Sequence, residues 1–283
     1  MSSLHFWLKV SRPHHCLAAG LAAWVSALLS NGTEWLTMTN LAAASSIALG
    51  CLGASVFHYG AANRMYARKY WDLIPLDNPI CLQRVGLAFM LTSVIIAVVM
   101  LNLFCVIVTF YNTVAIILYA RWLAKHWASK NLVIALVCTT PVLLGWFSGH
   151  RLNPVVPYGL GAVFCAYWAR EIIKDVSDIR ANQGIRVTLP IWLGIKQARK
   201  VAGGFQCISV VCLLLLSGRL LNYPVYVLAP FSLALTVFGA TAWSLFHGQR
   251  ENSEARWIVY GTWMMICTFF GVRFAYALQS SGP

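Results

Sequence analysis

Charged residues are scarce in this chain. Only 10% of its 283 residues are Asp, Glu, Lys or Arg, whereas soluble globular proteins carry about 25%. The chain also lacks a Gly-rich phosphate loop, a dinucleotide-binding fingerprint and any Cys/His spacing typical of a metal site. Its nine cysteines are scattered singly, mostly inside apolar runs, so we expect them to pack as small apolar residues without disulfides. These absences exclude the common soluble nucleotide-binding and zinc-binding classes.

Apolar residues dominate instead, at 59% of the chain with a mean hydropathy of +0.69. Runs of roughly 20 apolar residues, each long enough to cross a bilayer, repeat along the sequence. We therefore predict an all-α, polytopic membrane bundle that forms one domain over residues 1–283. The first run should remain as a helix, because no small-residue cleavage site follows it. Nine membrane spans are predicted, at residues 14–31, 38–62, 84–101, 103–122, 131–149, 155–172, 200–221, 223–247 and 257–278.

The distribution of basic residues predicts the orientation of the bundle. The net charge is +13, but the basic residues lie at helix ends and form no basic arm, so we do not expect a nucleic-acid partner. With the N-terminus in the cytoplasm, the cytoplasmic segments hold 18 Lys and Arg and the outer segments hold 3. This asymmetry follows the positive-inside rule. It predicts a multi-pass integral membrane protein whose longer, polar loops, and hence its active site, face the cytoplasm.

The most polar stretch runs from Arg170 to Lys200 and holds three of the eight acids and seven of the 21 Lys and Arg. Ionised side chains are costly beside a membrane, so this cluster is a candidate functional site. On one continuous helix, Glu171, Asp175, Asp178 and Asn182 would form a single stripe, with Lys174 beside it. Carboxylates on one face repel each other. A divalent cation relieves that repulsion, and oxygen ligands of this kind suit Mg²⁺ together with substrate phosphates.

This stretch, REIIKDVSDIRANQG-IRVTLPIWLG, resembles the second aspartate-rich motif of the UbiA superfamily of intramembrane prenyltransferases. The family pattern D-x-x-D-x-x-x-D reads here as Asp175, Asp178 and then Asn182 at the third position. A Thr-Leu-Pro segment at 188–190 follows. The sequence of this stretch most resembles the branch of the family that prenylates glycerol-phosphate lipids. The resemblance implies a bundle of nine helices with polar chemistry on two cytoplasmic loops.

The first family motif, N-D-x-x-D-x-x-x-D, is degenerate in this chain. Asn63 is kept, but Arg64, Ala67 and Trp71 stand where the three acids belong. Asp72 would lie on the opposite side of a regular helix from Asn63, unless the helix unwinds near Pro75, and Asp77 lies in the loop beyond. In one reading, Arg64, Arg68 or Lys69 replaces one metal as a fixed cation against the diphosphate. In the other, diphosphate activation is lost, or these cations serve only as membrane anchors.

The resemblance implies transfer of a prenyl group from a prenyl diphosphate to a membrane-held acceptor of aromatic or glycerol-phosphate type, with release of diphosphate. It implies Mg²⁺ as the cofactor, held by Asn63, Asp175 and Asp178. Arg68, Lys125 and Lys174 would bind the diphosphate. The accessory candidates are Arg64, Asp72, Asp77, Tyr119 and Asn182.

Two readings from other classes remain open at this point. A catalytically degenerate homologue could bind prenyl lipid or scaffold a biosynthetic complex, and the three lost acids favour it. The retained acids of the second motif oppose it. A transporter is less favoured, because no acid or Lys lies near a predicted bilayer midplane and no pair of broken helices suggests a repeat.

Overall fold

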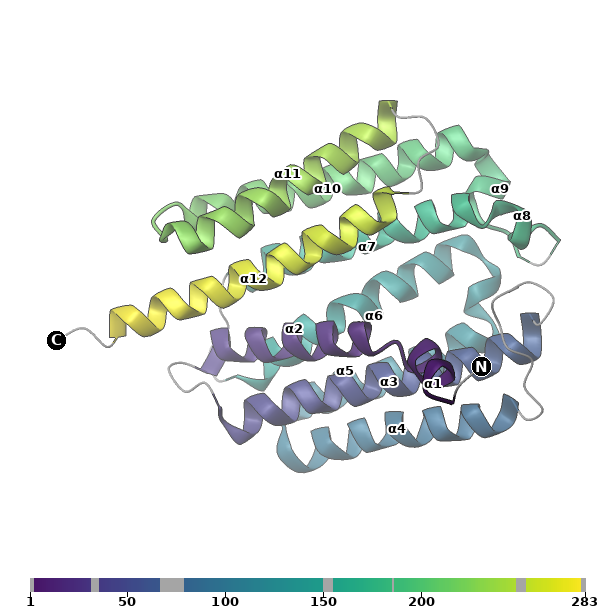
Figure 1. Ribbon diagram of the computed structural model, residues 1–283, viewed down its shortest axis with the longest axis horizontal. Coiled ribbons are helices and arrows are strands. Elements are labelled where there is room, and N and C mark those ends of the chain that lie inside the picture. Colours follow the sequence, from purple (N-terminus) through teal and green to yellow (C-terminus); the bar gives the residue numbers. More distant parts are fainter. Residues whose placement is uncertain are drawn as a thin grey trace. The chain divides into compact units, whose positions relative to one another are not determined.

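The computed structural model describes residues 3–31, 36–66, 79–149, 155–184, 186–247 and 253–280. Every element in these ranges is helical, apart from a single β-bridge between His126 and Val187 (Figure 1). The chain divides into two compact units, which are described separately. Unit 1 comprises Met1–Leu123 and Thr140–Arg151; unit 2 comprises Ala124–Thr139 and Leu152–Pro283.

Unit 1 is built around the long helix α3. It packs against α2, α4 and α5 and touches the short N-terminal helix α1. Glycines allow its closest approach, because a Cβ on Gly86 would lie 2.4 Å from the backbone nitrogen of Phe57. The helices of unit 1 are α1 (Ser3–Ser11), α2 (Pro13–Asn31), α3 (Met38–Tyr66), α4 (Pro79–Met100), α5 (Leu103–Arg121) and the second part of α6 (Trp127–Ser148).

The entry into α2 follows from local chemistry. Pro13 is its first residue, where the missing proline N–H would have had no helical partner. Arg12 before it has φ +46°, which separates α1 from α2. The sequence analysis did not predict α1 as a separate helix.

Unit 2 contains the first part of α6 and all the later helices. α7 packs against α10 and α12, and α11 packs against the same two helices. The remaining helices of unit 2 are α7 (Val156–Ser177), α8 (Ile179–Asn182), α9 (Leu189–Leu193), α10 (Ile195–Leu220), α11 (Val225–His247) and α12 (Glu254–Ser280); the short 3-10 turn η1 (Leu123–Lys125) precedes α6.

A buried ion pair joins three helices of unit 2. Nη2 of Arg199 lies 2.6 Å from Oε1 of Glu254 and donates to the carbonyl oxygen of Ser244 at 3.1 Å. Oγ of Ser244 donates to the same Glu254 oxygen at 3.0 Å. The pair ties the start of α10 to the end of α11 and the start of α12.

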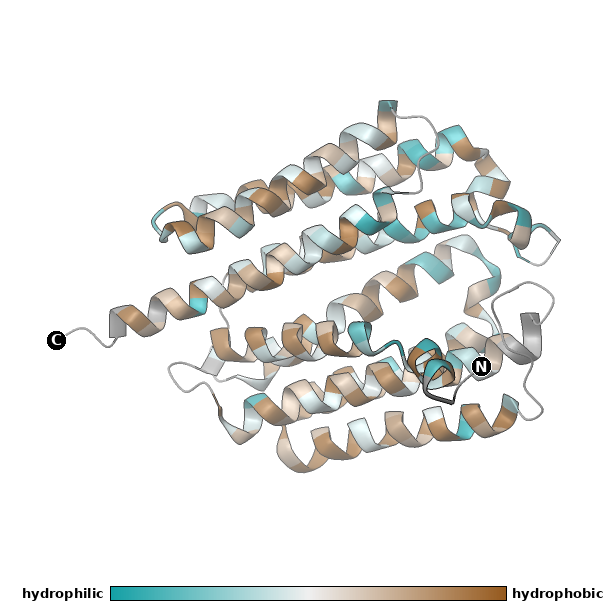
Figure 2. Ribbon diagram, viewed as in Figure 1, coloured by the Kyte–Doolittle hydropathy of each residue, from teal (hydrophilic) through white to brown (hydrophobic). Residues whose placement is uncertain are grey.

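The all-helical, multi-pass prediction is confirmed. Seven described helices are long and apolar enough to cross a membrane: α3, α4, α5, α6, α10, α11 and α12. α2 and α7 occupy the other two predicted spans. Large apolar side chains remain exposed on the long helices, for example Val99 on α4 and Leu215 on α10, as expected for surfaces that face lipid. Figure 2 shows the apolar residues along these helices.

Candidate functional site: a charged cluster at one end of unit 2

Polar residues of unit 2 gather where α7 ends and α10 begins (Figure 2). α7 stops at Ser177, and Asp178 forms its C-cap with φ −93° and ψ 12°. The chain continues through α8 and a turn at Gly184, whose φ of +74° favours glycine. Val187 then pairs with the segment that leads into α6, and its N–H donates to the carbonyl oxygen of Lys125 at 3.1 Å. This contact brings the connection after α8 beside the start of α6.

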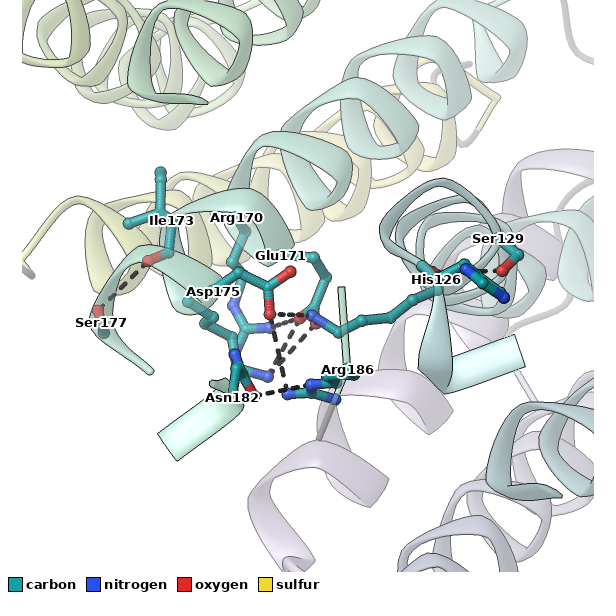
Figure 3. Close-up of polar contacts among 11 residues, drawn as sticks. His126, Ser129, Arg170, Glu171, Ile173, Asp175, Ser177, Asn182 and Arg186 are labelled. Atoms are coloured by element: carbon teal, nitrogen blue, oxygen red, sulfur yellow. Dashed lines mark hydrogen bonds and ion pairs between the residues drawn. The ribbon is translucent and has the colours of Figure 1, made fainter. Parts of the chain in front are cut away.

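Two carboxylates lie at the centre of the cluster. Glu171 and Asp175, one turn apart on α7, are 2% and 0% exposed (Figure 3). Each is compensated by cations, as buried carboxylates must be. Oε1 of Glu171 lies 2.8 Å from Nη1 of Arg170 and 3.2 Å from Nζ of Lys174. Glu171 is therefore already paired with the chain's own cations.

Lys130, in the first turn of α6, reaches both carboxylates. Its ammonium group forms an ion pair with Oδ1 of Asp175 and lies 3.8 Å from Oε2 of Glu171. The side chain of Lys130 is 4% exposed, although Lys is almost never fully buried unless paired. This buried cation holds the start of α6 to the end of α7.

Arg186 contributes a further positive charge from the connection after α8. Its Nε donates to Oδ1 of Asn182 at 2.7 Å, and its Nη2 lies 3.8 Å from Oδ1 of Asp175. Figure 3 shows dashed lines that join Arg186 to both Asn182 and Asp175. Arg presents its donors as a planar fork, which suits phosphate and carboxylate groups.

The local charge balance is positive. The cations Lys130, Arg170, Lys174 and Arg186 outnumber the carboxylates Glu171, Asp175 and Asp178. The side chain of Lys174 is 45% exposed, so its ammonium group remains open to solvent or ligand. Such a site attracts a multiply charged anion more strongly than it attracts a free divalent cation.

Some buried polar atoms of these elements have no hydrogen-bond partner among the described residues. They include Oδ2 of Asp175, Oγ1 of Thr188 and both side-chain polar atoms of Asn131. A buried polar atom without a hydrogen-bond partner costs about 1–3 kcal/mol, so such atoms usually bond to water or to a ligand. Asp175 Oδ2 is therefore available to a bound group, whereas Oδ1 is not.

The structure corrects the prediction of one continuous acidic stripe. Glu171 and Asp175 share a helix face, but the helix ends before Asp178, so Asn182 does not continue that face. Asn182 is fully buried and accepts a hydrogen bond from Arg186 instead. The physical reason is local, because Asp178 leaves the helical conformation with ψ 12° and ends α7 there.

The other predicted site residues fall into two groups. Lys125 is exposed at the end of η1, on the same segment as the β-bridge of unit 2. Tyr119 belongs to unit 1, where it is buried on α5 with its ring centroid 5.6 Å from that of His58. The backbone of Asn63 and Arg64 lies in α3, but their side chains lie outside the described part of the chain. Arg68, Asp72 and Asp77 also lie outside the described residues, so all five roles stay predictions.

The sequence analysis missed Lys130 and Arg186 as members of the site. Both had been counted only as cytoplasmic positive charges. A weak signal existed for Lys130, since it directly precedes a predicted span where a lysine must either reach the surface or find a buried acid. Its partner lies 45 residues away, and sequence spacing alone does not identify such a partner.

The Mg²⁺ that the resemblance implies was tested against these contacts. No three His, Cys, Asp or Glu side chains come together as a metal site within the described ranges. Both oxygens of Glu171 are engaged by cations, which leaves Asp175 Oδ2 and the half-buried Asp178. Mg²⁺ is usually held by one or two carboxylates plus substrate phosphates. Oδ2 of Asp175 therefore fits a magnesium ion that enters together with a diphosphate, and Asp178 as a second ligand stays a prediction.

The helices and the charged cluster define a polytopic membrane protein with an anion-attracting site at one end of unit 2. A family profile described as the UbiA prenyltransferase family matches residues 81–274. The chain belongs to this family, as its second motif predicts.

Two curated relatives of this chain share one name. The chain is 25% identical over 197 residues to a digeranylgeranylglyceryl phosphate synthase from Methanococcus maripaludis, covering 67% of this chain and 69% of that protein. It is 28% identical over 218 residues to the protein of that name from Natronomonas pharaonis, covering 72% and 74%.

Solved structures share the fold. A digeranylgeranylglyceryl phosphate synthase superposes with a TM-score of 0.75 at 17% identity, covering 98% of this chain and 100% of the other. A UbiA homologue from Archaeoglobus fulgidus with DMAPP and Mg²⁺ bound superposes with a TM-score of 0.73 at 15% identity, covering 96% and 99%. At these identities the likeness concerns the fold.

Proposed function

We propose that this protein transfers a prenyl group from a prenyl diphosphate to a glycerol-phosphate lipid and releases diphosphate. The observation that carries the proposal is the cation-rich cluster around Asp175 in a member of the UbiA family. The acceptor class is drawn from the relatives, which are named digeranylgeranylglyceryl phosphate synthases. The aromatic acceptors that the sequence left open are the alternative that the experiment below tests.

The chemistry requires a good leaving group and a dry site. The bond between the allylic carbon and the diphosphate oxygen breaks, and its electron pair stays on the diphosphate. A hydroxyl oxygen of the acceptor forms the new bond to carbon, and its proton leaves with the diphosphate. Preformed positive charge that faces the departing oxygens lowers this barrier, since negative charge develops there in the transition state.

The residues of this chain would supply most of that charge. Lys174 is half-exposed, and Arg186 carries a planar donor fork beside Asp175, so these two are proposed to contact the diphosphate. Lys125, which is exposed at the end of η1 in unit 2, is the third proposed contact. Asp175 and Asp178 are proposed to hold the magnesium ion, which would add Lewis-acid stabilisation of the diphosphate when bound. The apolar helices would keep water away from the carbocation.

We also propose nine spans in one membrane domain, with the N-terminus and the charged cluster on the cytoplasmic side. The 18-to-3 asymmetry of basic residues supports this orientation. The cluster contains four of those cytoplasmic cations, which agrees with a substrate diphosphate that arrives from the cytoplasm.

The test is diphosphate release by the purified protein in lipid. Geranylgeranyl diphosphate would be offered with glycerol-phosphate lipids or with aromatic acceptors, in the presence of Mg²⁺ or of a chelator. We expect release that needs Mg²⁺ and the glycerol-phosphate lipid and that is lost in Asp178→Ala. Release with aromatic acceptors alone would overturn the acceptor class. No release with any acceptor, together with saturable prenyl diphosphate binding, would favour the degenerate homologue.

A further inference from the structure

The ammonium group of Lys130 lies between the two buried carboxylates of α7. It contacts Oδ1 of Asp175 and lies 3.8 Å from Oε2 of Glu171, so it bridges these two side chains. An ammonium group is a compact point charge with three donors. The bridging position between the two carboxylates is therefore filled by the chain itself.

Burial makes this arrangement costly unless it has a use. Lys130, Glu171 and Asp175 have side chains that are 4%, 3% and 1% exposed. Replacing a buried ion pair by apolar residues of similar volume is often neutral or stabilising, so stability alone does not explain the pair. The pair keeps a fixed positive charge between the two carboxylates.

The remaining acids leave room for a single metal ion. Among the described residues of the cluster, only Asp175 Oδ2 and Asp178 are not already engaged by a cation. At the first motif, Arg64, Ala67 and Trp71 stand where the family pattern has acids. The loss of carboxylates in the first motif and the internal cation beside the second both reduce the number of oxygen ligands that are open to metal ions.

We propose that Lys130 is a built-in cation that replaces one divalent metal ion, so that the protein binds its prenyl diphosphate with a single Mg²⁺. This inference rests on the proposed function for the identity of the anion, but the competition between Lys130 and a metal ion at Asp175 does not depend on it. Lys130 is a positioning residue in this scheme. It holds Asp175 so that Oδ2 faces the one metal ion, and it lowers the number of metal ions that the site takes up.

Counting metal ions tests the proposal. Mn²⁺ would serve as the probe for Mg²⁺, with free Mn²⁺ measured by electron paramagnetic resonance. The full-length protein in lipid nanodiscs would be titrated with and without geranylgeranyl thiodiphosphate, an analogue that ionises poorly. We expect one Mn²⁺ per chain in the wild type with the analogue bound.

Removing Lys130 should open the second position. Lys130→Ala leaves Asp175 and Glu171 without their bridging charge, and we expect a second Mn²⁺ to bind at least about tenfold more tightly than any second ion in the wild type. Lys200→Ala is the matched control. It removes an exposed lysine of α10 to which no role in the cluster is given, so the number of Mn²⁺ ions should not change.

Each outcome decides the proposal. Two Mn²⁺ ions per wild-type chain, or no gain in Lys130→Ala, would overturn it. If Lys130→Ala does not fold, the Mn²⁺ count of the wild type, which needs no variant, still tests the proposal. Failure of the analogue to bind any variant would refute the proposed function alone, because the gain of Mn²⁺ binding in Lys130→Ala without analogue would still support the metal replacement.

Discussion

Lys130 and Asp175 lie 45 residues apart in the sequence and form an ion pair whose side chains are 4% and 1% exposed. The pair joins the first turn of α6 to the last turns of α7 within unit 2. Because both charges are desolvated, each depends on the other far more than two surface charges would.

The first prediction concerns the stability of this pair. Lys130→Met leaves Asp175 buried beside one fewer cation, and we expect the free energy of unfolding to fall by about 3–5 kcal/mol. The double variant Lys130→Met/Asp175→Leu removes both charges and should recover most of that loss. Denaturant unfolding in detergent measures both. Additive losses in the double variant would show that the two side chains are not coupled.

The second prediction concerns Asp178. This half-buried carboxylate has no ion pair among the described contacts, so its removal should leave the fold intact. We expect Asp178→Ala to lower Mg²⁺-dependent diphosphate release by about 10²–10³-fold, a typical loss for one electrostatic group at the reacting centre. Gln183→Ala, at an exposed position just after α8, is the control and should keep full activity. Unchanged release in Asp178→Ala would remove this residue from the metal site.

The third prediction concerns the Arg199–Glu254 pair. Glu254 is fully buried, so Glu254→Ala strands the Arg199 guanidinium and should lower the free energy of unfolding by about 3–5 kcal/mol. Arg256→Ala removes an exposed charge two residues along the same helix and should change it by no more than about 0.5 kcal/mol. Thermal unfolding in detergent distinguishes them. Equal midpoints for both variants would mean that the pair contributes little.

The fourth prediction concerns the α3–α4 contact in unit 1. A Cβ at Gly86 would lie 2.4 Å from the backbone nitrogen of Phe57, so Gly86→Ala should force the helices apart and cost about 1–3 kcal/mol. Gly204 lies in α10 with nothing within 4 Å of its added Cβ. Gly204→Ala should therefore stabilise the protein by about 0.5–1 kcal/mol, because alanine loses less backbone entropy in a helix. The same unfolding assay measures the loss of stability in Gly86→Ala and the gain in Gly204→Ala. A stabilising Gly86→Ala would contradict the close approach of α3 and α4.

The fifth prediction concerns orientation. Gln183 follows α8 in the charged cluster, and Asn222 lies in the exposed turn after α10. With the exposed Cys81, Cys207 and Cys267 replaced by alanine, a membrane-impermeant maleimide should label Gln183→Cys only in inside-out vesicles. Asn222→Cys should react only in right-side-out vesicles. The reverse pattern would invert the proposed topology and place the site outside the cytoplasm.

The helices were predictable because their signals are local. An apolar run of about 20 residues has few alternatives to a membrane helix, since the bilayer leaves backbone groups no other partner. Ends were less certain, and α10 begins at Ile195 rather than near residue 200. The first turns of this helix carry Lys196 and Arg199, so a search for runs of apolar residues does not include them.

The acids of the site were also visible in the sequence, but their partners were not. Asp175 and Asp178 stand out because carboxylates are rare and expensive in so apolar a chain. The ion pair with Lys130, the contact of Arg186 with Asp175 and the end of α7 at Asp178 are decided by the tertiary structure. A buried charge needs an opposite charge close to it in space, and the residue that supplies this charge can be far away in the sequence. The sequence by itself thus determined a helical membrane protein with an acidic motif, and only the tertiary structure, which places Lys130 of α6 beside Asp175 of α7, decided which cation pairs with that motif.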